Sequence, residues 1–508
     1  MSKHSITRRR FVAGTLAGGA AAAIPAAAEA AKRGPNPKPK HPAPGSVRTA
    51  DVVIVGAGFA GLTAARNIRA AGKSVIVLEA RDRVGGRVWN HDLGGGVISE
   101  RGGTFIGPTQ DRLAALASAL GVQTFNTYDN GNDVYVNGSN RMTYSDTGPL
   151  GTAPPDPAAI ADLAAVVARL DQMSTSVPVD APWDASNAAE WEGYTLERWV
   201  KENSASPSFQ ALVPLATRPI FGAEPRELSL LFTLFYIASS GNEQNPGTFE
   251  RNFDTRDGGQ QSRFVGGSQT IALKIAAQLG SRVVLSTPVR RLVQGSSGIT
   301  AYTEKVTVKA KRAIVAVPPA LAGRIDYEPL LPFQRDQLTQ RYGQGTLSKV
   351  AAVYNRPFWR DAGLTGQAVD TGGPVSATFD DSPPTASSSQ GPGIIFGFVG
   401  GDNARSYATM SPGARKAAVL GQFAKFFGSR ALQATDFFET FWSADEWARG
   451  CPVGIPATGA LLAYGPWLRQ PVGRIHWAGT ETSNYWNGYM DGAVRSGERA
   501  AGEVLNGL

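Results

Sequence analysis

Three glycines, Gly56, Gly58 and Gly61, are spaced as G-x-G-x-x-G directly after the apolar run DVVIV. A helical pattern follows over about 60–71, and a second apolar run covers 74–78. This order predicts a β-α-β unit. Its glycines permit a tight turn and let a pyrophosphate approach the N-terminus of the helix, where free N–H groups favour an anion.

An acidic residue at the end of the second run extends the motif. Glu79 stands eighteen residues after Gly61, at the position where a carboxylate can accept hydrogen bonds from both ribose hydroxyls of a dinucleotide. The segment RDRVGGR follows at 81–87 and places a second glycine turn and Arg87 beside this acid. These features favour dinucleotide binding over a purely structural glycine turn.

The first residues have the pattern of an export signal. The sequence TRRRF at 7–11 precedes a run rich in glycine and alanine, which ends in a small-x-small cleavage site at Ala30. We predict a twin-arginine signal peptide over 1–30 and a mobile linker rich in proline and lysine over 31–48, with delivery to the periplasm or the exterior. The alternative, a basic tail before a membrane helix, is weakened by Pro25 within the run.

Charge and motif content exclude several classes of function. The net charge is +8, but nine of the 50 basic residues and one of the 42 acidic residues precede residue 49, which leaves 41 of each. A neutral folded part does not favour a nucleic-acid partner. The rest of the chain has no apolar stretch long enough for a membrane anchor. The histidines lack metal-ligand spacing and there is no G-x-S-x-G motif, so we predict neither a metal site nor a hydrolase.

Further stretches resemble the flavin-containing amine oxidase family, and the monoamine oxidases in particular. They are ERGGTFIGPTQDRL at 100–113, GGQQSRFVGGS at 258–268, VPPAL at 317–321 and GRIHWAGTETSNYWNGYMDGAVRSGERAAGEVL at 473–505. The resemblance runs from about residue 49 to the C-terminus. It implies FAD as cofactor and an α/β fold, in which a Rossmann-like FAD-binding domain of the glutathione-reductase type is interleaved with an α+β substrate-binding domain.

The resemblance also implies domain bounds and cofactor contacts. The FAD-binding domain is expected over 49–124, 265–338 and 445–508, and the substrate-binding domain over 125–264 and 339–444. A helix over about 490–505 would direct free N–H groups at the flavin. The residues expected to bind the cofactor are Gly56, Gly58, Gly61, Glu79, Arg81, Arg87, Val289, Cys451, Gly479, Thr480 and Met490.

Cys451 is the only cysteine, so it cannot form an intramolecular disulfide. It matches the cysteine that is bonded to the flavin 8α-methyl group in the monoamine oxidases. Such a bond needs a thiolate and therefore a positive neighbourhood, and Arg449 stands two residues away. The resemblance thus implies a covalently bound flavin, with an inert buried thiol as the alternative.

Two residues are expected to be catalytic, Lys349 and Tyr489. Lys349 interrupts an apolar, strand-like run, where an unpaired ammonium is costly. A buried lysine is commonly an ion-pair partner, but the resemblance implies that Lys349 holds a water against flavin N5. Tyr489 matches one of two tyrosines that flank the flavin, and Pro452 occupies the position of the other.

The expected substrate residues are Phe253, Gln260, Phe398 and again Tyr489, which match channel and pocket positions of the family. Ala377 stands where the family has an aromatic gate, and this indicates a wider entrance. The pocket should therefore be largely apolar.

The resemblance implies an oxidase that converts a primary amine and oxygen, through an imine, into aldehyde, ammonia and hydrogen peroxide. An L-amino-acid oxidase is an alternative that needs a buried cation, for which Arg218 is the candidate. A polyamine oxidase needs a pocket acid, and the sequence places none. A desaturase or isomerase without oxidase activity is a more distant alternative. The sequence leaves a homodimer open.

Overall fold

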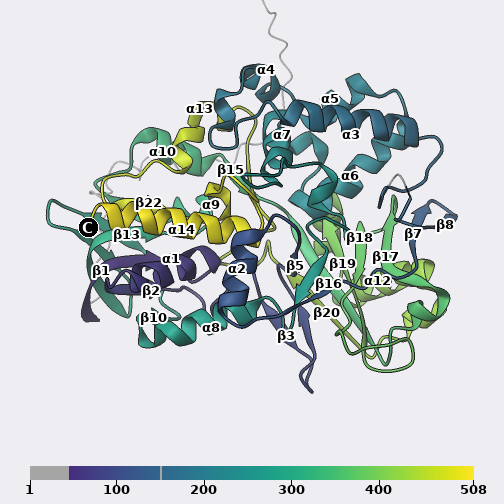
Figure 1. Ribbon diagram of the computed structural model, residues 1–508, viewed down its shortest axis with the longest axis horizontal. Coiled ribbons are helices and arrows are strands. Elements are labelled where there is room, and N and C mark those ends of the chain that lie inside the picture. The colour runs from purple at the N-terminus through teal and green to yellow at the C-terminus, as the bar shows by residue number, and fades with distance from the viewer. Residues whose placement is uncertain (1–44, 149–150) are drawn as a thin grey trace, which may run out of the picture. The chain divides into compact units, whose positions relative to one another are not determined.

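The structure is a computed structural model that describes residues 45–148 and 151–508 (Figure 1). The signal peptide predicted over 1–30 lies outside the described residues, as does most of the linker predicted over 31–48. Across the described ranges, no helix combines the length and the apolar character needed to cross a bilayer.

The β-α-β unit predicted around the glycines is confirmed. It consists of β1 (Ser46–Val55), α1 (Phe59–Ala70) and β2 (Val75–Leu78), and β1 and β2 pair in parallel. They belong to a mixed sheet in which β22 (Ile475–Trp477) pairs with β13. The other strands, in sheet order, are β10 (Val283–Val284), β2, β1, β13 (Val306–Val315), β12 (Ile299–Tyr302), β11 (Arg291–Gln294) and β14 (Asp326–Glu328).

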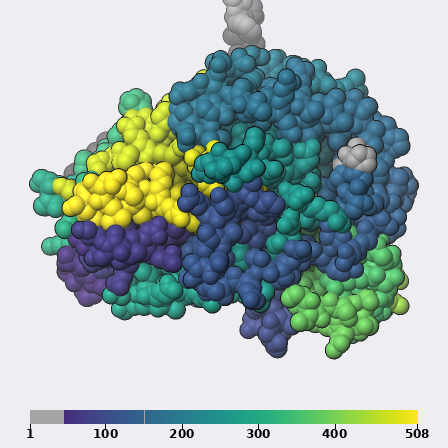
Figure 2. All heavy atoms as spheres, in the orientation of Figure 1, coloured from purple at the N-terminus to yellow at the C-terminus, as the bar shows by residue number. Residues whose placement is uncertain are grey.

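The C-terminal helix covers this unit. Helix α14 (Met490–Asn506) agrees with the predicted helix and packs against α1 (Figure 1). The yellow atoms of the C-terminal segment adjoin the purple atoms of the N-terminal unit on the surface (Figure 2). Gly497 makes this approach possible, because a Cβ there would lie 2.3 Å from the carbonyl oxygen of Ala60. Distant parts of the sequence thus form one layer of the nucleotide-binding half.

A second sheet carries the residues expected on the substrate side. Its strands, in sheet order, are β20 (Asp436–Phe441), β16 (Leu347–Tyr354), β19 (Gly393–Gly400), β18 (Ala377–Asp380), β17 (Leu364–Asp370), β7 (Asn132–Asn137) and β8 (Asn140–Tyr144). Lys349 on β16 pairs with Phe398 on β19, which pairs with Ala377 on β18. The register therefore aligns three predicted site residues across neighbouring strands.

Helices with buried apolar side chains lie beside this sheet, at the upper right of Figure 1. They are α3 (Ile160–Ser174), α5 (Leu196–Asn203), α6 (Pro207–Phe221) and α7 (Leu230–Ser239). The hydroxyls of Thr195, Ser206 and Ser229 cap α5, α6 and α7 by accepting hydrogen bonds from backbone N–H groups of the first turn. Helix α7 reads LLFTLFYIAS and is almost wholly buried, so it forms part of the core rather than of the surface.

Further helices and short strands connect these layers. The helices are α2 (Asp111–Ala119), α4 (Ala188–Glu192), α8 (Gln269–Leu279), α9 (Pro319–Ala322), α10 (Phe333–Gln340), α11 (Gly401–Ala408), α12 (Pro412–Phe427) and α13 (Ala460–Tyr464). The strands are β3 (Asn90–Asp92), β4 (Ile98–Glu100), β5 (Phe105–Ile106), β6 (Thr124–Asn126), β9 (Ser262–Phe264), β15 (Tyr342–Gln344) and β21 (Gly454–Pro456). The mixed α/β fold is thus confirmed. Contacts join the residues from 45 onward into one compact unit, and the bounds of the two interleaved domains stay a prediction.

Candidate active site

A cavity of about 520 Å³ extends from the glycine turns of the first sheet to the second sheet and the apolar helices. It gathers nearly all of the predicted site residues. Those that line it are Gly56, Gly58, Glu79, Arg81, Arg87, Phe253, Gln260, Val289, Lys349, Phe398, Cys451, Gly479, Thr480, Tyr489 and Met490. Pro452 and Ala377 line it as well, whereas Gly61 and Arg218 lie outside its wall.

The glycine turns form a cradle at one end of this cavity. Gly56 has a φ of +100°, which disfavours any residue with a side chain. At Gly61 a Cβ would lie 2.0 Å from the carbonyl oxygen of Gly56, so the absent side chain lets the helix close against the turn. Gly58 and Gly86 face one another, since a Cβ on Gly86 would lie 3.3 Å from Gly58 Cα. Two backbone turns therefore meet where a pyrophosphate needs close approach.

The acid at the end of β2 is fixed by the backbone. Glu79 is buried, and its carboxylate accepts hydrogen bonds from the N–H groups of Ala57 at 2.6 Å and Arg81 at 2.9 Å. The guanidinium of Arg81 in turn pairs with Asp445 at 2.6 Å. Each carboxylate oxygen can accept a second hydrogen bond, so Glu79 keeps acceptor capacity for a ribose hydroxyl. The cradle and this acid fit an adenine dinucleotide such as FAD.

The cysteine lies on the wall of the same cavity. Cys451 is buried, and its Sγ lies 3.8 Å from the carbonyl oxygen of Leu347. Burial raises the pKa of the Cys451 thiol, while the positive charges of Arg87 and Lys349 oppose that rise. The expectation that Arg449 supplies the positive neighbourhood is wrong, because Arg449 is exposed and the cations acting on the thiol come from distant segments.

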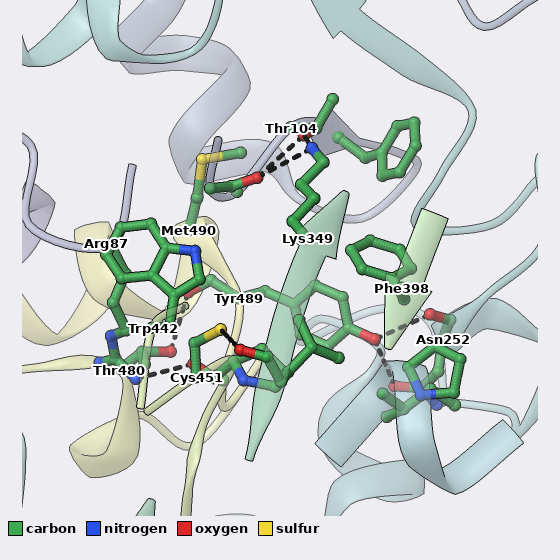
Figure 3. Close-up of a pocket in the computed structure, with 18 of the residues that line it drawn as sticks. Arg87, Thr104, Asn252, Lys349, Phe398, Trp442, Cys451, Thr480, Tyr489 and Met490 are labelled. Carbon is green, nitrogen blue, oxygen red and sulfur yellow. Dashed lines mark hydrogen bonds between the residues drawn. The ribbon is translucent and has the colours of Figure 1, made fainter. Parts of the chain in front are cut away.

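Lys349 is held by polar groups of the loop after β4. The residue is 2% exposed. Its Nζ donates hydrogen bonds to Thr104 Oγ1 at 2.6 Å and to the carbonyl oxygen of Gly102 at 3.2 Å (Figure 3). The Nζ also lies 3.7 Å from the ring centroid of Phe396, a cation–π contact. Burial lowers the pKa of Lys349 to about 8, whereas the negative charges of Asp381 and Glu100 act to raise it.

Tyr489 is fixed on three sides at the start of α14. Its hydroxyl donates a hydrogen bond to the carbonyl oxygen of Asn252 at 2.8 Å (Figure 3). Its ring centroid lies 4.8 Å from that of Trp486 and 5.8 Å from that of Tyr236. Sequence reasoning missed Asn252 and Tyr236. They belong to other segments, and no local pattern marks them as neighbours of Tyr489.

The part of the cavity beyond Tyr489 is mostly apolar but contains two acids. Helices α3, α5 and α6 contribute Leu163, Val166, Val167, Leu170, Leu196, Val200, Leu212, Val213, Leu215 and Ile220. Asp133 and Glu250 also line the cavity. Asp133 accepts a hydrogen bond from Thr365 Oγ1 at 2.5 Å, and burial raises the pKa of its carboxyl to about 7. Sequence reasoning placed no acid in the pocket, and the structure places these two.

The site combines a Rossmann-type sheet, whose glycine turns open into the cavity, with a buried lysine and a fixed tyrosine. This combination defines a dinucleotide-dependent redox enzyme. Comparison with known proteins makes the class specific. The model of the flavin containing amine oxidoreductase family matches residues 59–505, and the chain belongs to this family.

Individual relatives agree. A Mycobacterium tuberculosis protein that carries the name flavin-containing monoamine oxidase AofH is 41% identical over 456 residues, which is 90% of this chain and 96% of the relative. Amine oxidase [flavin-containing] B of Sus scrofa is 36% identical over 90% of this chain and 86% of its own length.

Two solved structures are similar throughout. Putrescine oxidase bound to putrescine has a TM-score of 0.84 at 31% identity, covering 91% of this chain and 100% of its own. Cyclohexylamine oxidase from Brevibacterium oxydans has a TM-score of 0.83 at 34% identity, covering 90% of this chain and 99% of its own. The chain is therefore an FAD-dependent amine oxidase of the monoamine oxidase type, which acts on small-molecule amines with oxygen.

Proposed function

We propose that the substrate is a neutral primary monoamine with an apolar tail, which is converted through an imine into aldehyde, ammonia and hydrogen peroxide. The observation that carries this proposal is the single cavity that joins the glycine cradle to an apolar lobe through Lys349 and Tyr489. An ionised group is costly in an apolar lobe unless it is paired, so the lobe favours an uncharged amine and tail.

The chain's own residues have distinct tasks in this proposal. FAD, when bound, supplies the acceptance of two electrons from the amine and their transfer to oxygen. Tyr489, which Asn252 and Trp486 hold in place, orients the amine by its ring face. Lys349 holds a water through its ammonium group, because its other hydrogen bonds to Thr104 and Gly102 fix the position of Nζ. The apolar side chains of α3, α5 and α6 exclude bulk water.

We further propose that the flavin is attached to Cys451 through sulfur. The thiol lines the cavity, and two cations, Arg87 and Lys349, favour its thiolate form against the effect of burial. Three similar solved structures are variants of putrescine oxidase from a redesign of cofactor binding, and each contains an alanine-to-cysteine substitution. An introduced cysteine is thus part of a redesign of cofactor binding in a related protein.

Export through the twin-arginine pathway is part of the proposal and rests on the TRRRF motif. Replacing Arg8 and Arg9 together by lysine should retain the protein in the cytoplasm, as cell fractionation would measure. Equal export of this variant and the wild type would contradict the proposal.

The homodimer that the sequence leaves open stays a prediction, which the hydrodynamic mass of the purified protein tests.

A second candidate function is oxidation of diamines or polyamines. Asp133 and Glu250 on the cavity wall could pair with a second ammonium group, and a similar structure, putrescine oxidase, has putrescine bound. The L-amino-acid alternative has less support, because Arg218 lies outside the cavity wall and already pairs with Glu224 at 2.8 Å.

A peroxide assay with an amine panel separates these candidates. The proposal expects phenylethylamine, tyramine and medium-chain alkylamines to give higher kcat/KM than putrescine, spermidine or the corresponding α-amino acids. A preference for putrescine or spermidine would replace the monoamine proposal by the second candidate. A preference for α-amino acids would contradict both.

A further inference from the structure

A buried cluster of three charged side chains lies near Lys349. Arg263 on β9 pairs with Glu100 at 3.1 Å and with Asp381, which follows β18, at 2.7 Å. The hydroxyl of Ser99 also donates a hydrogen bond to Asp381. Glu100, Arg263 and Asp381 are 1%, 3% and 0% exposed. Such a cluster is costly to bury, and burial of this kind is weak evidence for a stabilising role alone.

The cluster is joined to Lys349 through the loop after β4. Glu100 ends that strand, and two residues later the carbonyl oxygen of Gly102 accepts a hydrogen bond from Lys349 Nζ. Asp381 and Glu100 raise the pKa of Lys349, whereas burial and the charge of Arg263 lower it. Cys451 is the other group that acts on this pKa. These are the charged and titratable neighbours that decide whether Lys349 carries its proton.

The cluster has an incompletely satisfied acid. Glu100 Oε1 is buried and has no hydrogen-bond partner, while Oε2 bonds to Arg263. Burial raises the pKa of the Glu100 carboxyl to about 7, with Arg263 opposing. One arginine therefore serves two acids, and the remaining negative charge is balanced within the buried region by Lys349. In a low-dielectric interior such a charge acts over several ångströms.

We propose that Glu100 and Asp381, held by Arg263, are positioning residues that keep Lys349 protonated while reduced enzyme reacts with oxygen. The inference rests on the role proposed for Lys349 and names what sets its charge. A protonated Lys349 donates a hydrogen bond to the water it holds and places a fixed positive charge where oxygen gains negative charge. The acids do not touch the reacting atoms and act through Lys349.

The test compares Glu100→Gln and Asp381→Asn with wild type and with Lys349→Met. Two quantities are measured in the holoenzyme between pH 6 and 10, namely the rate constant of reduced enzyme with oxygen and the absorbance of the oxidised flavin. The titration that is lost in Lys349→Met belongs to Lys349. Its midpoint should fall by about one pH unit in each acid variant, the effect of losing one nearby buried charge. At pH 8 the oxygen rate constant should then fall about fivefold, with little change at pH 6.

Glu192→Gln is the matched control. Glu192 is equally buried and accepts hydrogen bonds from Ser229 and Leu461, but it is not among the groups that act on Lys349. This variant should lose stability without moving the Lys349 midpoint. If Glu100→Gln fails to fold, Asp381→Asn still carries the test. Glu100→Asp then replaces Glu100→Gln as the conservative variant, and its Lys349 midpoint should lie near that of wild type.

Two outcomes would overturn the inference. One is an unchanged Lys349 midpoint in the acid variants. The other is the absence of any Lys349-dependent titration between pH 6 and 10 in both measurements. A different result tests the role of Lys349 itself: if Lys349→Met leaves the oxygen reaction unchanged, that role is wrong, while the absorbance titration still shows whether the acids set the charge of Lys349.

Discussion

The guanidinium of Arg87 donates hydrogen bonds to both carboxylate oxygens of Glu481, at 2.6 and 3.0 Å. The same guanidinium donates to the carbonyl oxygen of Pro452 at 2.7 Å, and Glu481 accepts a hydrogen bond from the N–H of Gly454 at 3.0 Å. One ion pair thus joins the second glycine turn, the loop that carries Cys451 and the C-terminal motif. Arg87 lies on the cavity wall, so the pair with Glu481 supports the cofactor site from behind that wall.

Removing one member of this pair should therefore destabilise the protein and its hold on FAD. Glu481→Leu should lower the free energy of unfolding by about 3 kcal/mol, because it leaves a largely buried guanidinium unpaired. The double variant Arg87→Met with Glu481→Leu should recover part of the loss. Denaturant unfolding and the bound flavin content measure both effects.

The exposed pair Arg198–Glu202 on α5 is the control for this prediction. Glu202→Gln should change the free energy of unfolding by less than about 0.5 kcal/mol, because solvent screens an exposed pair. Equal losses in Glu481→Leu and Glu202→Gln would contradict the role given to the buried pair.

Cys451→Ala should release the flavin on acid precipitation, whereas the wild-type pellet should stay yellow. The physical reason is the proposed bond between Sγ and the flavin, since non-covalent contacts are lost when the fold is lost. The absorbance of pellet and supernatant measures the distribution. A colourless wild-type pellet would show that Cys451 is an inert buried thiol.

Lys349→Met should slow the reaction of reduced enzyme with oxygen at least about tenfold, the size of effect expected from losing one buried charged hydrogen-bond donor. The rate of anaerobic reduction by amine should stay within about threefold of the wild-type rate. Methionine keeps a comparable length but removes the positive charge, and with it the cation–π contact with Phe396. Stopped-flow measurement of each half-reaction separates the two steps. A loss confined to reduction by amine would assign Lys349 to substrate oxidation instead.

Pro452→Tyr should shift the preference toward flat aromatic amines. Pro452 lines the cavity, and a ring at this position would narrow the space beside Tyr489. We expect the ratio of kcat/KM for phenylethylamine over a medium-chain alkylamine to rise by about tenfold, the lower end of the range for one apolar contact. The matched variant Ala377→Phe changes the entrance instead, so it should lower kcat/KM for bulky amines of both kinds. An unchanged ratio in Pro452→Tyr would show that position 452 does not shape the binding site.

Asp133 should make stability depend on pH. Burial raises the pKa of its carboxyl to about 7, so the folded state binds this proton more tightly than the unfolded state does. Stability from this group is therefore lost as pH rises from about 4 to 7. Asp133→Asn should raise the melting temperature at pH 8 and leave it nearly unchanged at pH 4, where the carboxyl is protonated in the folded state.

The same variant bears on the substrate. Asp133→Asn should leave phenylethylamine turnover nearly unchanged if the monoamine proposal holds. A selective rise in KM for putrescine would instead support pairing of Asp133 with a second ammonium group. For the stability prediction, a melting temperature of Asp133→Asn below that of wild type at pH 8 would be the contradicting result.

The β-α-β unit, a helix over about 490–505 and the family could be predicted from the sequence alone, which also predicts the residues of the flavin site. These features depend on local rules: glycines such as Gly56 are required by a turn with positive φ, and helical spacing fixes which face of α14 is buried. Most residues predicted to bind the cofactor lie within such continuous motifs and line one cavity, and their contacts with FAD stay a prediction.

The neighbours of these groups, by contrast, depend on how distant segments pack together. Arg87 rather than the neighbouring Arg449 acts on Cys451, and Asp133 enters a pocket for which the sequence had placed no acid. The pairing of Arg263 with Glu100 and Asp381 joins segments that no local pattern relates. The physical reason is that burial and charge depend on the three-dimensional position of every neighbour, whereas spacing along the chain reports only hydrogen bonding and packing within a few residues.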